Sequence, residues 1–126
     1  MVLGCGVDIV CVPHIQRAVE RWGDKFLSRV YTPRELAVGR GRIRHYEFLA
    51  ARFAAKEAVM KAFGAWRGNM GLPFHCIEIL ADEHGRPLVH LSGAALQVQR
   101  RSRATQVMVS LSHTEDYSVA SAVIAR

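Results

Sequence analysis

The order of apolar and polar residues in the N-terminal part of the chain predicts one strand followed by helices. Residues 3–10 are mainly apolar, end in β-branched side chains and contain two glycines, which is typical of a strand that packs closely against a neighbour. Pro13 suits the first turn of a helix that we expect to run to Trp22 and to end at Gly23. The segment Thr-Pro-Arg-Glu at 32–35 has the residues of a capping box, so another helix is predicted to begin there.

The longest helical pattern covers residues 44–63, which contain no glycine or proline and are rich in Ala, Leu, Phe, Glu and Lys. We expect this helix to end at Gly64. An apolar stripe at helical spacing is formed by Leu49, Ala50, Phe53, Ala54 and Met60.

Strand patterns dominate the C-terminal half. Residues 74–80 and 88–91 flank a polar turn at 82–87 and predict a β-hairpin. A short helix is predicted at 93–101, and two further strands at 107–111 and 117–124. This order of elements indicates an α+β fold, with one long helix packed on a mainly antiparallel sheet.

Length and composition indicate a folded protein of one domain. The chain has 126 residues, so we expect residues 1–126 to form a single domain. Half of the residues are hydrophobic and 22% are charged, which argues against a disordered chain. The sequence contains no run of 18 apolar residues, so no transmembrane helix is predicted. The first residues lack the basic segment of a signal peptide.

The three cysteines, Cys5, Cys11 and Cys76, form no CxxC pair, and their spacing fits neither a disulfide framework nor a zinc site. We therefore expect reduced, largely buried thiols. A protein of this kind belongs in a reducing compartment, which we expect to be the cytoplasm.

A formal net charge of +6 favours an acidic partner, such as a nucleic acid, an anionic lipid, an acidic protein or a phosphorylated small molecule. The chain has no five consecutive basic residues, and its few aromatic residues do not interleave with a basic run, which argues against a nucleic-acid surface. A basic cluster that fits an anion contact, but has no assigned role, comprises Arg40, Arg42, Arg44 and His45.

Two positions carry charges where the surrounding pattern is apolar or small. Asp8 interrupts an apolar strand, and a carboxylate buried without a partner costs free energy. It is therefore either a solvent-facing strand end or a metal ligand or catalytic carboxylate. Glu57 and Lys61 lie four residues apart on one helix face, which fits either an ordinary surface ion pair or a functional site. The alanines around them would let another backbone or a ligand approach closely, which favours a site.

A third candidate is the segment Ser-Leu-Ser-His-Thr at 110–114, at the end of a predicted strand. Its hydroxyls and His113 suit an anion such as phosphate, although a histidine in a turn is often only solvated. The chain has no GxSxG elbow, no Walker-type loop, no dinucleotide-binding glycine pattern and no HExxH pair. The corresponding hydrolase, nucleotide-loop and zinc-protease sites are therefore not indicated.

Four motifs occur in a specific order along the chain. They are G-V-D-I-V at 6–10, R-F-A-A-K-E-A-V-M-K-A-F-G at 52–64, G-R-P at 85–87 and S-L-S-H-T-E-D-Y-S-V-A at 110–120. Together they resemble the holo-acyl-carrier-protein synthases, the small bacterial type of 4′-phosphopantetheinyl transferase. The F-A-A-K-E-A run is the most specific of them, and the resemblance extends from Gly4 to Ile124.

The resemblance implies an enzyme that moves the phosphopantetheine arm of coenzyme A onto a serine of apo acyl carrier protein and releases adenosine 3′,5′-bisphosphate. It implies Asp8 and Glu57 as ligands of Mg²⁺, with Mn²⁺ as an alternative, since magnesium typically takes few carboxylates together with phosphate oxygens. Glu57 is also the candidate general base, directly or through a water molecule held by the metal, and these two roles compete. Lys61 is expected to face the diphosphate and to stabilise or protonate the leaving group.

The resemblance also implies the residues that bind coenzyme A. His113 and Thr114 are expected to contact its phosphates, and Gly64 to let the end of the long helix approach it. Residues expected near the nucleotide are Arg52, Gly85, Arg86 and Pro87. Lys56 belongs to the motif either as a functional residue or as part of a structural ion pair.

The same resemblance implies a homotrimer with active sites between subunits. Asp8, Glu57 and Lys61 of one chain are then expected to meet His113 and Thr114 of its neighbour. The apolar strand at 117–124 lies either at such an interface or in the core.

Acyl carrier proteins are strongly acidic, so the first helix is the expected dock for the carrier. Arg17, Arg21 and Lys25 recur every four residues, and Arg29 continues the spacing, which suits either a dock or a solvated face. His14 stands where the family often has arginine, a departure that bears on the carrier contact and not on the chemistry.

Two other functions stay open. One is a family member that binds coenzyme A or a carrier protein without catalysis, although Asp8, Glu57 and Lys61 argue against an inactive enzyme. The other is a small basic nucleic-acid-binding protein, whose affinity would fall steeply with salt.

Overall fold

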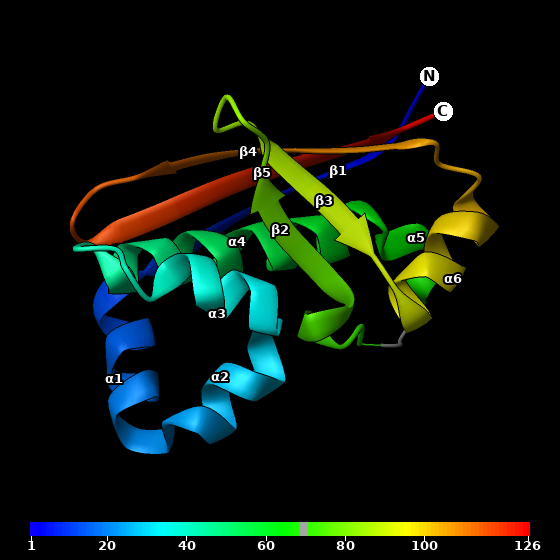
Figure 1. The fold of residues 1–126 in the computed structure, drawn as a ribbon. Coiled ribbons are helices and arrows are strands. Elements are labelled where there is room, and N and C mark those ends of the chain that lie inside the picture. Colours follow the sequence, from blue (N-terminus) through cyan, green and yellow to red (C-terminus); the bar gives the residue numbers. More distant parts are fainter. Residues whose placement is uncertain (69–70) are drawn as a thin grey trace.

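A computed structural model describes residues 1–68 and 71–126 of the chain (Figure 1). The N-terminal elements, in order, are β1 (Val2–Cys11), α1 (Val12–Trp22), α2 (Asp24–Val30), α3 (Pro33–Gly39), α4 (His45–Ala62) and α5 (Gly64–Arg67). The remaining elements are the 3₁₀ turn η1 (Phe74–Cys76), β2 (Ile77–Ala81), β3 (Pro87–Leu91), α6 (Gly93–Ser102), β4 (Gln106–His113) and β5 (Tyr117–Ala125). This confirms the α+β fold predicted from the sequence.

The strands form two antiparallel sheets. The first has three strands in the order β1-β5-β4, so β1 and β4 are its two edges. Asp8 pairs with Ala120 of β5, and Ala120 in turn pairs with Leu111 of β4. The hairpin β2-β3 forms the second sheet. The predicted hairpin is therefore confirmed, although it does not join the larger sheet.

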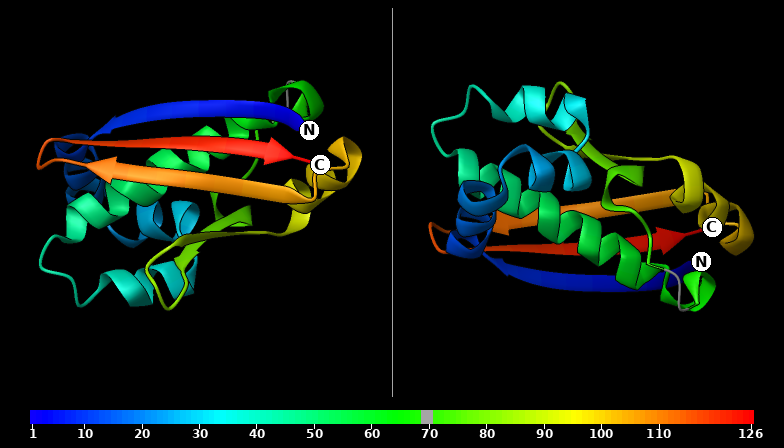
Figure 2. Two further views of the ribbon diagram at one scale, coloured as in Figure 1. Left: turned by 90° about the horizontal axis from the view of Figure 1, so that it is seen from above. Right: turned by 90° about the horizontal axis from the view of Figure 1, so that it is seen from below.

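Helix α4 is the centre of the fold. It contacts all three strands of the larger sheet on one side and α3 and β2 on others. Seen from above, it crosses the sheet diagonally, from the β4 edge at its N-terminus to the β1 edge at its C-terminus (Figure 2). Most of its residues are therefore buried, and not only the single stripe predicted from the sequence.

Glycines in β1 allow this strand to lie directly on α4. A Cβ atom on Gly6 would lie 2.8 Å from Lys61 Cβ and 2.9 Å from Ala62 N, and would overlap Ala58 O. A Cβ atom on Gly4 would overlap Ala62 O. Because alternate strand residues share a face, Asp8 continues this row toward the helix. The two glycines thus place the carboxylate of Asp8 beside the C-terminal half of α4.

The N-terminal helices begin and end close to where the sequence predicts. Gly23 adopts a left-handed φ of 54° and separates α1 from α2. Thr32 and Glu35 form the predicted capping box at the start of α3, in which each side chain accepts a hydrogen bond from the other residue's backbone N–H. The long helix ends at Ala62, and Gly64 opens the short helix α5 instead of ending α4.

One face of the larger sheet packs on α4, and its other face presents apolar side chains to solvent. Val7 and Ile9 of β1 are 60% and 66% exposed. Met108 of β4 and Tyr117 and Val119 of β5 are also exposed. We call these five residues the open sheet face. An apolar surface of this kind is typical of an interaction site.

The cysteines are unpaired, as predicted, but they are not largely buried. Cys76 is buried, Cys11 is half-buried and Cys5 is exposed. Cys5 lies between Gly4 and Gly6, whose positions face α4, so strand alternation turns its thiol to the open sheet face. None of the helices in the described part of the chain is long and apolar enough to cross a membrane.

Candidate active site

The contact between β1 and α4 brings three candidate catalytic residues together. Lys61 Nζ donates hydrogen bonds to Asp8 Oδ1 and to the carbonyl oxygen of Val7, each at 3.0 Å. Asp8 is mostly buried, whereas Lys61 is about half exposed, so the pair lies at the molecular surface. Glu57 precedes Lys61 by four residues and therefore lies one turn away on the same side of α4.

Glu57 is an unusual carboxylate in its charge environment. Partial burial raises its pKa first, and the negative charge of Asp8 raises it further, while Lys61 and Arg67 act in the opposite direction. Two carboxylates are thus close enough to repel each other, with a lysine beside them. Such a cluster gains stability from a cation or from a proton on one of its members.

These residues fit a divalent cation of the magnesium type. Carboxylate oxygens are the hard donors that Mg²⁺ prefers, and a cation between Asp8 and Glu57 would relieve their repulsion. Within residues 1–68 and 71–126, no group of three or more His, Cys, Asp and Glu side chains is arranged to hold a metal ion. A cation held by these two carboxylates would therefore take its other ligands from water or from a phosphorylated substrate.

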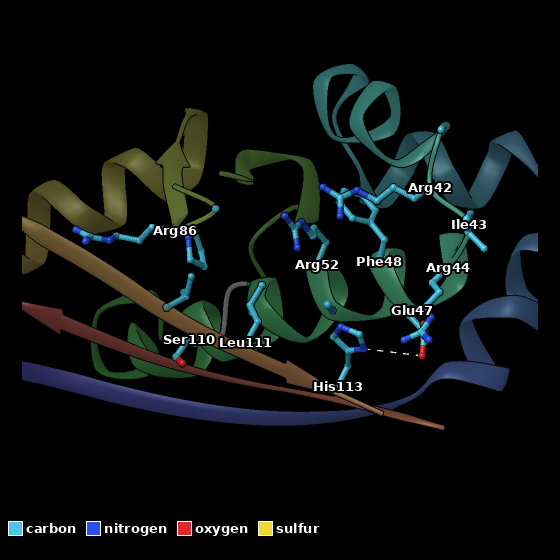
Figure 3. Close-up of a pocket in the computed structure, with 15 residues that line it drawn as sticks. Arg42, Ile43, Arg44, Glu47, Phe48, Arg52, Arg86, Ser110, Leu111 and His113 are labelled. Atoms are coloured by element: carbon cyan, nitrogen blue, oxygen red, sulfur yellow. Dashed lines mark ion pairs between the residues drawn. The ribbon is translucent and has the colours of Figure 1, made fainter. Parts of the chain in front are cut away.

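A separate pocket of about 1050 Å³ lies at the other end of α4 (Figure 3). Its walls come from the segment before α4, the first two turns of α4, the β2-β3 turn and β4. The lining includes four residues that the sequence placed near the nucleotide, Arg52, Gly85, Arg86 and Pro87, together with His113. The structure thus brings most of the expected coenzyme A contacts to one place.

The pocket is strongly cationic. Arg42 and Arg52 both place their guanidinium groups over the ring of Phe48, at 4.8 and 4.3 Å from its centroid. Burial lowers the pKa of Arg52, and the nearby charge of Arg42 lowers it further. Its Nε atom is buried with no hydrogen-bond partner among the described residues. Two guanidinium groups held side by side over one ring are well suited to bind an anion.

The β2-β3 turn is held by its own hydrogen bonds. Asp82 Oδ1 accepts hydrogen bonds from His84 N at 2.8 Å and from Arg86 N at 2.9 Å. Gly85 has a φ of 79°, a conformation that other residues rarely adopt. These features form a tight turn that presents Arg86 and Pro87 to the pocket.

Two expected contacts are placed differently. Thr114 does not line the pocket, and its hydroxyl oxygen accepts hydrogen bonds from the backbone N–H groups of Asp116 and Tyr117, which closes the β4-β5 turn. Gly64 also lies away from the pocket, and a Cβ atom there would meet no atom of residues 1–68 and 71–126 within 4 Å. Its lack of a side chain therefore serves no close contact with the described residues of this chain.

Sequence reasoning gave no role to several pocket residues. Arg42, Arg44, Glu47 and Phe48 all line the pocket. The basic cluster before the long helix was the available signal for the arginines. The position of Glu47 in the first turn of α4 gave no such signal, since acidic residues are common there for reasons of helix stability.

Lys56, the central residue of the F-A-A-K-E-A motif, is structural. Its side chain is fully buried, and its Nζ donates a hydrogen bond to Glu35 Oε1 at 2.8 Å. It also donates to the carbonyl oxygens of Phe74 and Ile77. Burial lowers the pKa of Lys56, and the charge of Glu35 opposes that shift. The ion pair therefore ties α4 to α3 and to the start of β2.

The carboxylate cluster and the pocket occupy different sides of the chain. Asp8 lies on the β1 edge of the sheet, whereas His113 lies on the β4 edge. Glu57 follows Glu47 by ten residues of helix, which corresponds to about 15 Å along the axis of α4. Asp8, Glu57 and Lys61 do not line the pocket.

The expected carrier dock spans two helices instead of one. Arg17 and Arg21 are exposed on α1, and Lys25 and Arg29 are exposed on α2. The basic stripe of the first helix ends with Arg21, because Gly23 ends α1 before Lys25, as the sequence predicted. Trp22 bridges the two parts, since it lines one shallow hollow with Arg17 and Arg21 and another with Lys25 and Arg29.

Comparison with known proteins gives a consistent result. Residues 4–122 match the family model of the 4′-phosphopantetheinyl transferase superfamily. The holo-[acyl-carrier-protein] synthase of Koribacter versatilis is 44% identical over 125 residues, which cover 98% of each chain. The protein of the same name from Desulforudis audaxviator is 47% identical over 123 residues, covering 98% of this chain and 92% of that protein.

Solved structures agree with the sequence matches. The crystal structure of holo-[acyl-carrier-protein] synthase from Neisseria meningitidis superposes with a TM-score of 0.89, at 34% identity and over 100% of both chains. The Bacillus anthracis enzyme in complex with CoA (3′,5′-ADP) has a TM-score of 0.79 at 34% identity, over 98% of this chain and 96% of that one. The chain therefore belongs to the holo-[acyl-carrier-protein] synthases of the 4′-phosphopantetheinyl transferase superfamily.

Proposed function

We propose that the chain transfers the 4′-phosphopantetheine group of coenzyme A to a serine of apo acyl carrier protein. The serine oxygen forms a bond to the phosphorus that carries the pantetheine group. The bond from that phosphorus to the bridging oxygen of the diphosphate breaks, and adenosine 3′,5′-bisphosphate leaves. The serine proton is removed, and the leaving phosphate carries the developed negative charge.

The cluster at the β1 edge is the observation that carries this proposal. Asp8, Glu57 and Lys61 combine two carboxylates with an ammonium group in a solvent-accessible position. We assign Glu57 the role of general base toward the serine hydroxyl, which its raised pKa suits. Lys61 faces the diphosphate and stabilises the leaving group. Asp8 holds Lys61 in place through the hydrogen bond at 3.0 Å.

Asp8 and Glu57 are also the proposed ligands of Mg²⁺, or of Mn²⁺ in its place. Bound there, the ion would neutralise negative charge on the diphosphate. The two carboxylates and their mutual repulsion support this assignment.

The pocket at the β4 edge is the proposed site of the nucleotide end of coenzyme A. The Bacillus anthracis relative was solved with CoA (3′,5′-ADP), and the Helicobacter pylori relative, at 28% identity and a TM-score of 0.82, with coenzyme A. Arg42 and Arg52 form no ion pair with a described residue, so their charges suit a phosphate, and Arg86 and His113 extend the cationic surface. Thr114, which follows His113 in the same chain, and Gly64 of the neighbouring subunit remain proposed contacts of coenzyme A.

A second copy of the chain is the proposed means of joining the two clusters. Neither cluster alone provides both the carboxylates and the anion pocket, and they lie at opposite edges of one sheet. A ring of copies in which the β1 edge of one meets the β4 edge of the next completes every site, and we propose a homotrimer. The open sheet face supports such an assembly, because it offers an apolar surface for burial between copies.

The carrier protein is proposed to dock on α1 and α2. Arg17 and Arg21 lie on the helix that directly follows β1, nine and thirteen residues after Asp8. An acidic carrier bound there would bring its serine to the carboxylate cluster of the same chain. The unpaired thiols suit a reducing compartment, and we propose the cytoplasm.

The direct test is the mass of a carrier protein. Apo acyl carrier protein incubated with the chain, coenzyme A and Mg²⁺ is expected to gain the mass of one phosphopantetheine group per molecule. A carrier whose serine is replaced by alanine is the control and should gain nothing. No gain in the unaltered carrier at saturating coenzyme A would contradict the proposal and would favour a binding protein without catalysis.

A further inference from the structure

Glu47 is a buried carboxylate without hydrogen bonds. Its side chain is 9% exposed, and no donor among the described residues reaches either of its carboxylate oxygens. The nearest ionisable groups are Arg44, whose Nε lies 3.6 Å from Oε2, and His113, whose Nδ1 lies 3.8 Å from Oε1 (Figure 3). Both distances are too long for hydrogen bonds but allow electrostatic attraction.

Stability alone does not explain a carboxylate in this position. Burial of a charge without hydrogen bonds is costly, and an apolar side chain of similar size is often equally stable or more so. The first turn of α4 favours a negative charge, which offsets part of this cost but would do so equally at an exposed position. By this argument stability does not favour a carboxylate over an apolar residue at position 47, which points to a functional role.

Direct contact with a ligand does not explain it either. The other charged residues of the lining are arginines, which suits a polyanion, and a bare carboxylate would repel phosphate groups. Both oxygens of Glu47 are also shielded from solvent, so a ligand in the pocket does not reach them in this arrangement. The carboxylate can act only through the side chains beside it.

Those side chains both line the pocket and are accessible to solvent. Arg44 has a side chain that is 71% exposed, and that of His113 is 44% exposed. Without an anchor, an exposed arginine samples many rotamers and loses conformational entropy when it binds a ligand. A buried anion behind both of them attracts the guanidinium group and a proton on Nδ1 of the imidazole. This leaves Nε2 of His113 and the outer N–H groups of Arg44 available to the pocket.

We propose that Glu47 is a positioning residue, a buried anchor that holds Arg44 and His113 in the orientation that binds the phosphates of coenzyme A. The inference rests on the proposed function, because it takes coenzyme A as the ligand of this pocket. It adds a division of labour within the pocket: Arg42 and Arg52 stack on the ring of Phe48 and Arg86 sits in the hydrogen-bonded β2-β3 turn, whereas Arg44 and His113 are held by Glu47.

Two variants separate positioning from a structural role. Glu47→Gln keeps the shape and removes the charge, and Glu47→Met replaces the carboxylate by an apolar side chain of similar length. Both are expected to unfold at the wild-type temperature or above it. The KM for coenzyme A should rise roughly tenfold, the scale of loss seen when a group supporting a binding residue is removed. The kcat and the KM for the carrier should stay within about twofold of the wild-type values, since Glu47 and the two residues it positions lie outside the carboxylate cluster.

A double-mutant cycle tests whether Glu47 acts through Arg44 and His113. In a His113→Ala, Arg44→Ala background, Glu47→Gln should change the affinity for coenzyme A by less than about twofold, because nothing is left to position. Affinity is measured by calorimetry with coenzyme A alone, which needs no turnover. Wild-type transfer measured in parallel shows whether the proposed function holds.

Three results would overturn the inference while the wild-type enzyme remains active. The first is wild-type affinity for coenzyme A in both Glu47 variants. The second is an undiminished effect of Glu47→Gln in the double-alanine background, which would mean that Glu47 acts elsewhere. The third is loss of thermal stability in both variants in proportion to the loss of affinity, which would mean a structural role.

Discussion

The absence of a side chain at Gly6 determines where Asp8 lies. Because β1 has glycine at the positions that face Ala58 and Ala62, its backbone contacts the helix backbone directly. Any larger residue would separate strand and helix by several tenths of an ångström or more. The hydrogen bond of 3.0 Å between Lys61 and Asp8 depends on this close approach.

Gly6→Ala is therefore expected to be destabilising by about 1–3 kcal/mol, the usual cost of forcing extra atoms into a packed site. Transfer activity should fall as well, because β1 moves away from Lys61. Urea unfolding and the rate of carrier modification measure the two effects. Gly64→Ala is the matched control for stability, since a Cβ atom there meets none of the described atoms within 4 Å. Equal stability of the two variants would contradict the close packing of β1 on α4.

Glu57 is the residue whose charge environment points most directly to chemistry. Glu57→Gln keeps the size of the side chain and removes both the base and a metal ligand. We expect a loss of kcat of at least about 10²-fold, the lower range for a general base. The unfolding temperature should change little, because the side chain is only partly buried. Wild-type kcat in this variant would exclude both roles assigned to Glu57.

At the scale of elements, two lysines of α4 have different tasks. Lys56 is buried in an ion pair that joins α4, α3 and β2, whereas Lys61 lies at the surface beside Asp8. The same chemical group thus serves folding at one position and the site at the other. The difference follows from the helix periodicity, which turns positions 56 and 61 to different neighbours.

The same substitution at both positions tests this division. Lys56→Met leaves the carboxylate of Glu35 buried and unpaired, so we expect a loss of about 3–5 kcal/mol in the free energy of unfolding. Lys61→Met removes a partly exposed pair and should cost less than about 1 kcal/mol. Its transfer rate should nevertheless fall strongly. Comparable stability loss in both variants would show that the assignment of the two lysines is wrong.

Helices α1 and α2 carry the proposed carrier dock. Arg21→Glu reverses a charge on this surface and is expected to raise the KM for the carrier about tenfold or more, with a KM for coenzyme A near the wild-type value. Arg101→Glu is the control of equal charge change, on the exposed surface of α6 at the other end of the molecule from α1 (Figure 1). Steady-state kinetics with each substrate varied in turn measures both constants. Equal increases for the two substrates, or equal effects of the two variants, would remove this surface as the dock.

The sequence predicted the elements that carry a local signal. The capping box at Thr32, the glycine-free run before Gly64 and the alternation in the last two strands all depend on near neighbours. Helix α2 was missed because seven residues contain too few turns to show a helical period. The burial of Lys56 also needed the structure, since its partner Glu35 lies in another helix.

The same distinction holds for the candidate site. Asp8, Glu57 and Lys61 were found because a charge in an apolar strand and a four-residue spacing are local features. The roles of Arg44 and Glu47 depend on β4, which is about sixty residues away in the chain and is brought to α4 only by the sheet. A contact of this kind leaves no periodic pattern in one sequence.

At the scale of the whole molecule, helix α4 divides the site. Its C-terminal half holds Glu57 and Lys61 at the β1 edge, and its N-terminal half forms the pocket floor at the β4 edge (Figures 2 and 3). The three strands of this sheet share an apolar face that no part of the described chain covers. A ring of copies would bury this face and bring unlike edges together.

The most direct test of the account is activity from two inactive chains. Glu57→Gln disables the carboxylate cluster, and Arg52→Ala disables the pocket, so each variant alone is expected to be nearly inactive. If each site takes its halves at random from two neighbouring chains, equal co-expression should restore about a quarter of the wild-type sites. Activity of the mixed protein no higher than that of its two parents would contradict a site shared between copies of this chain.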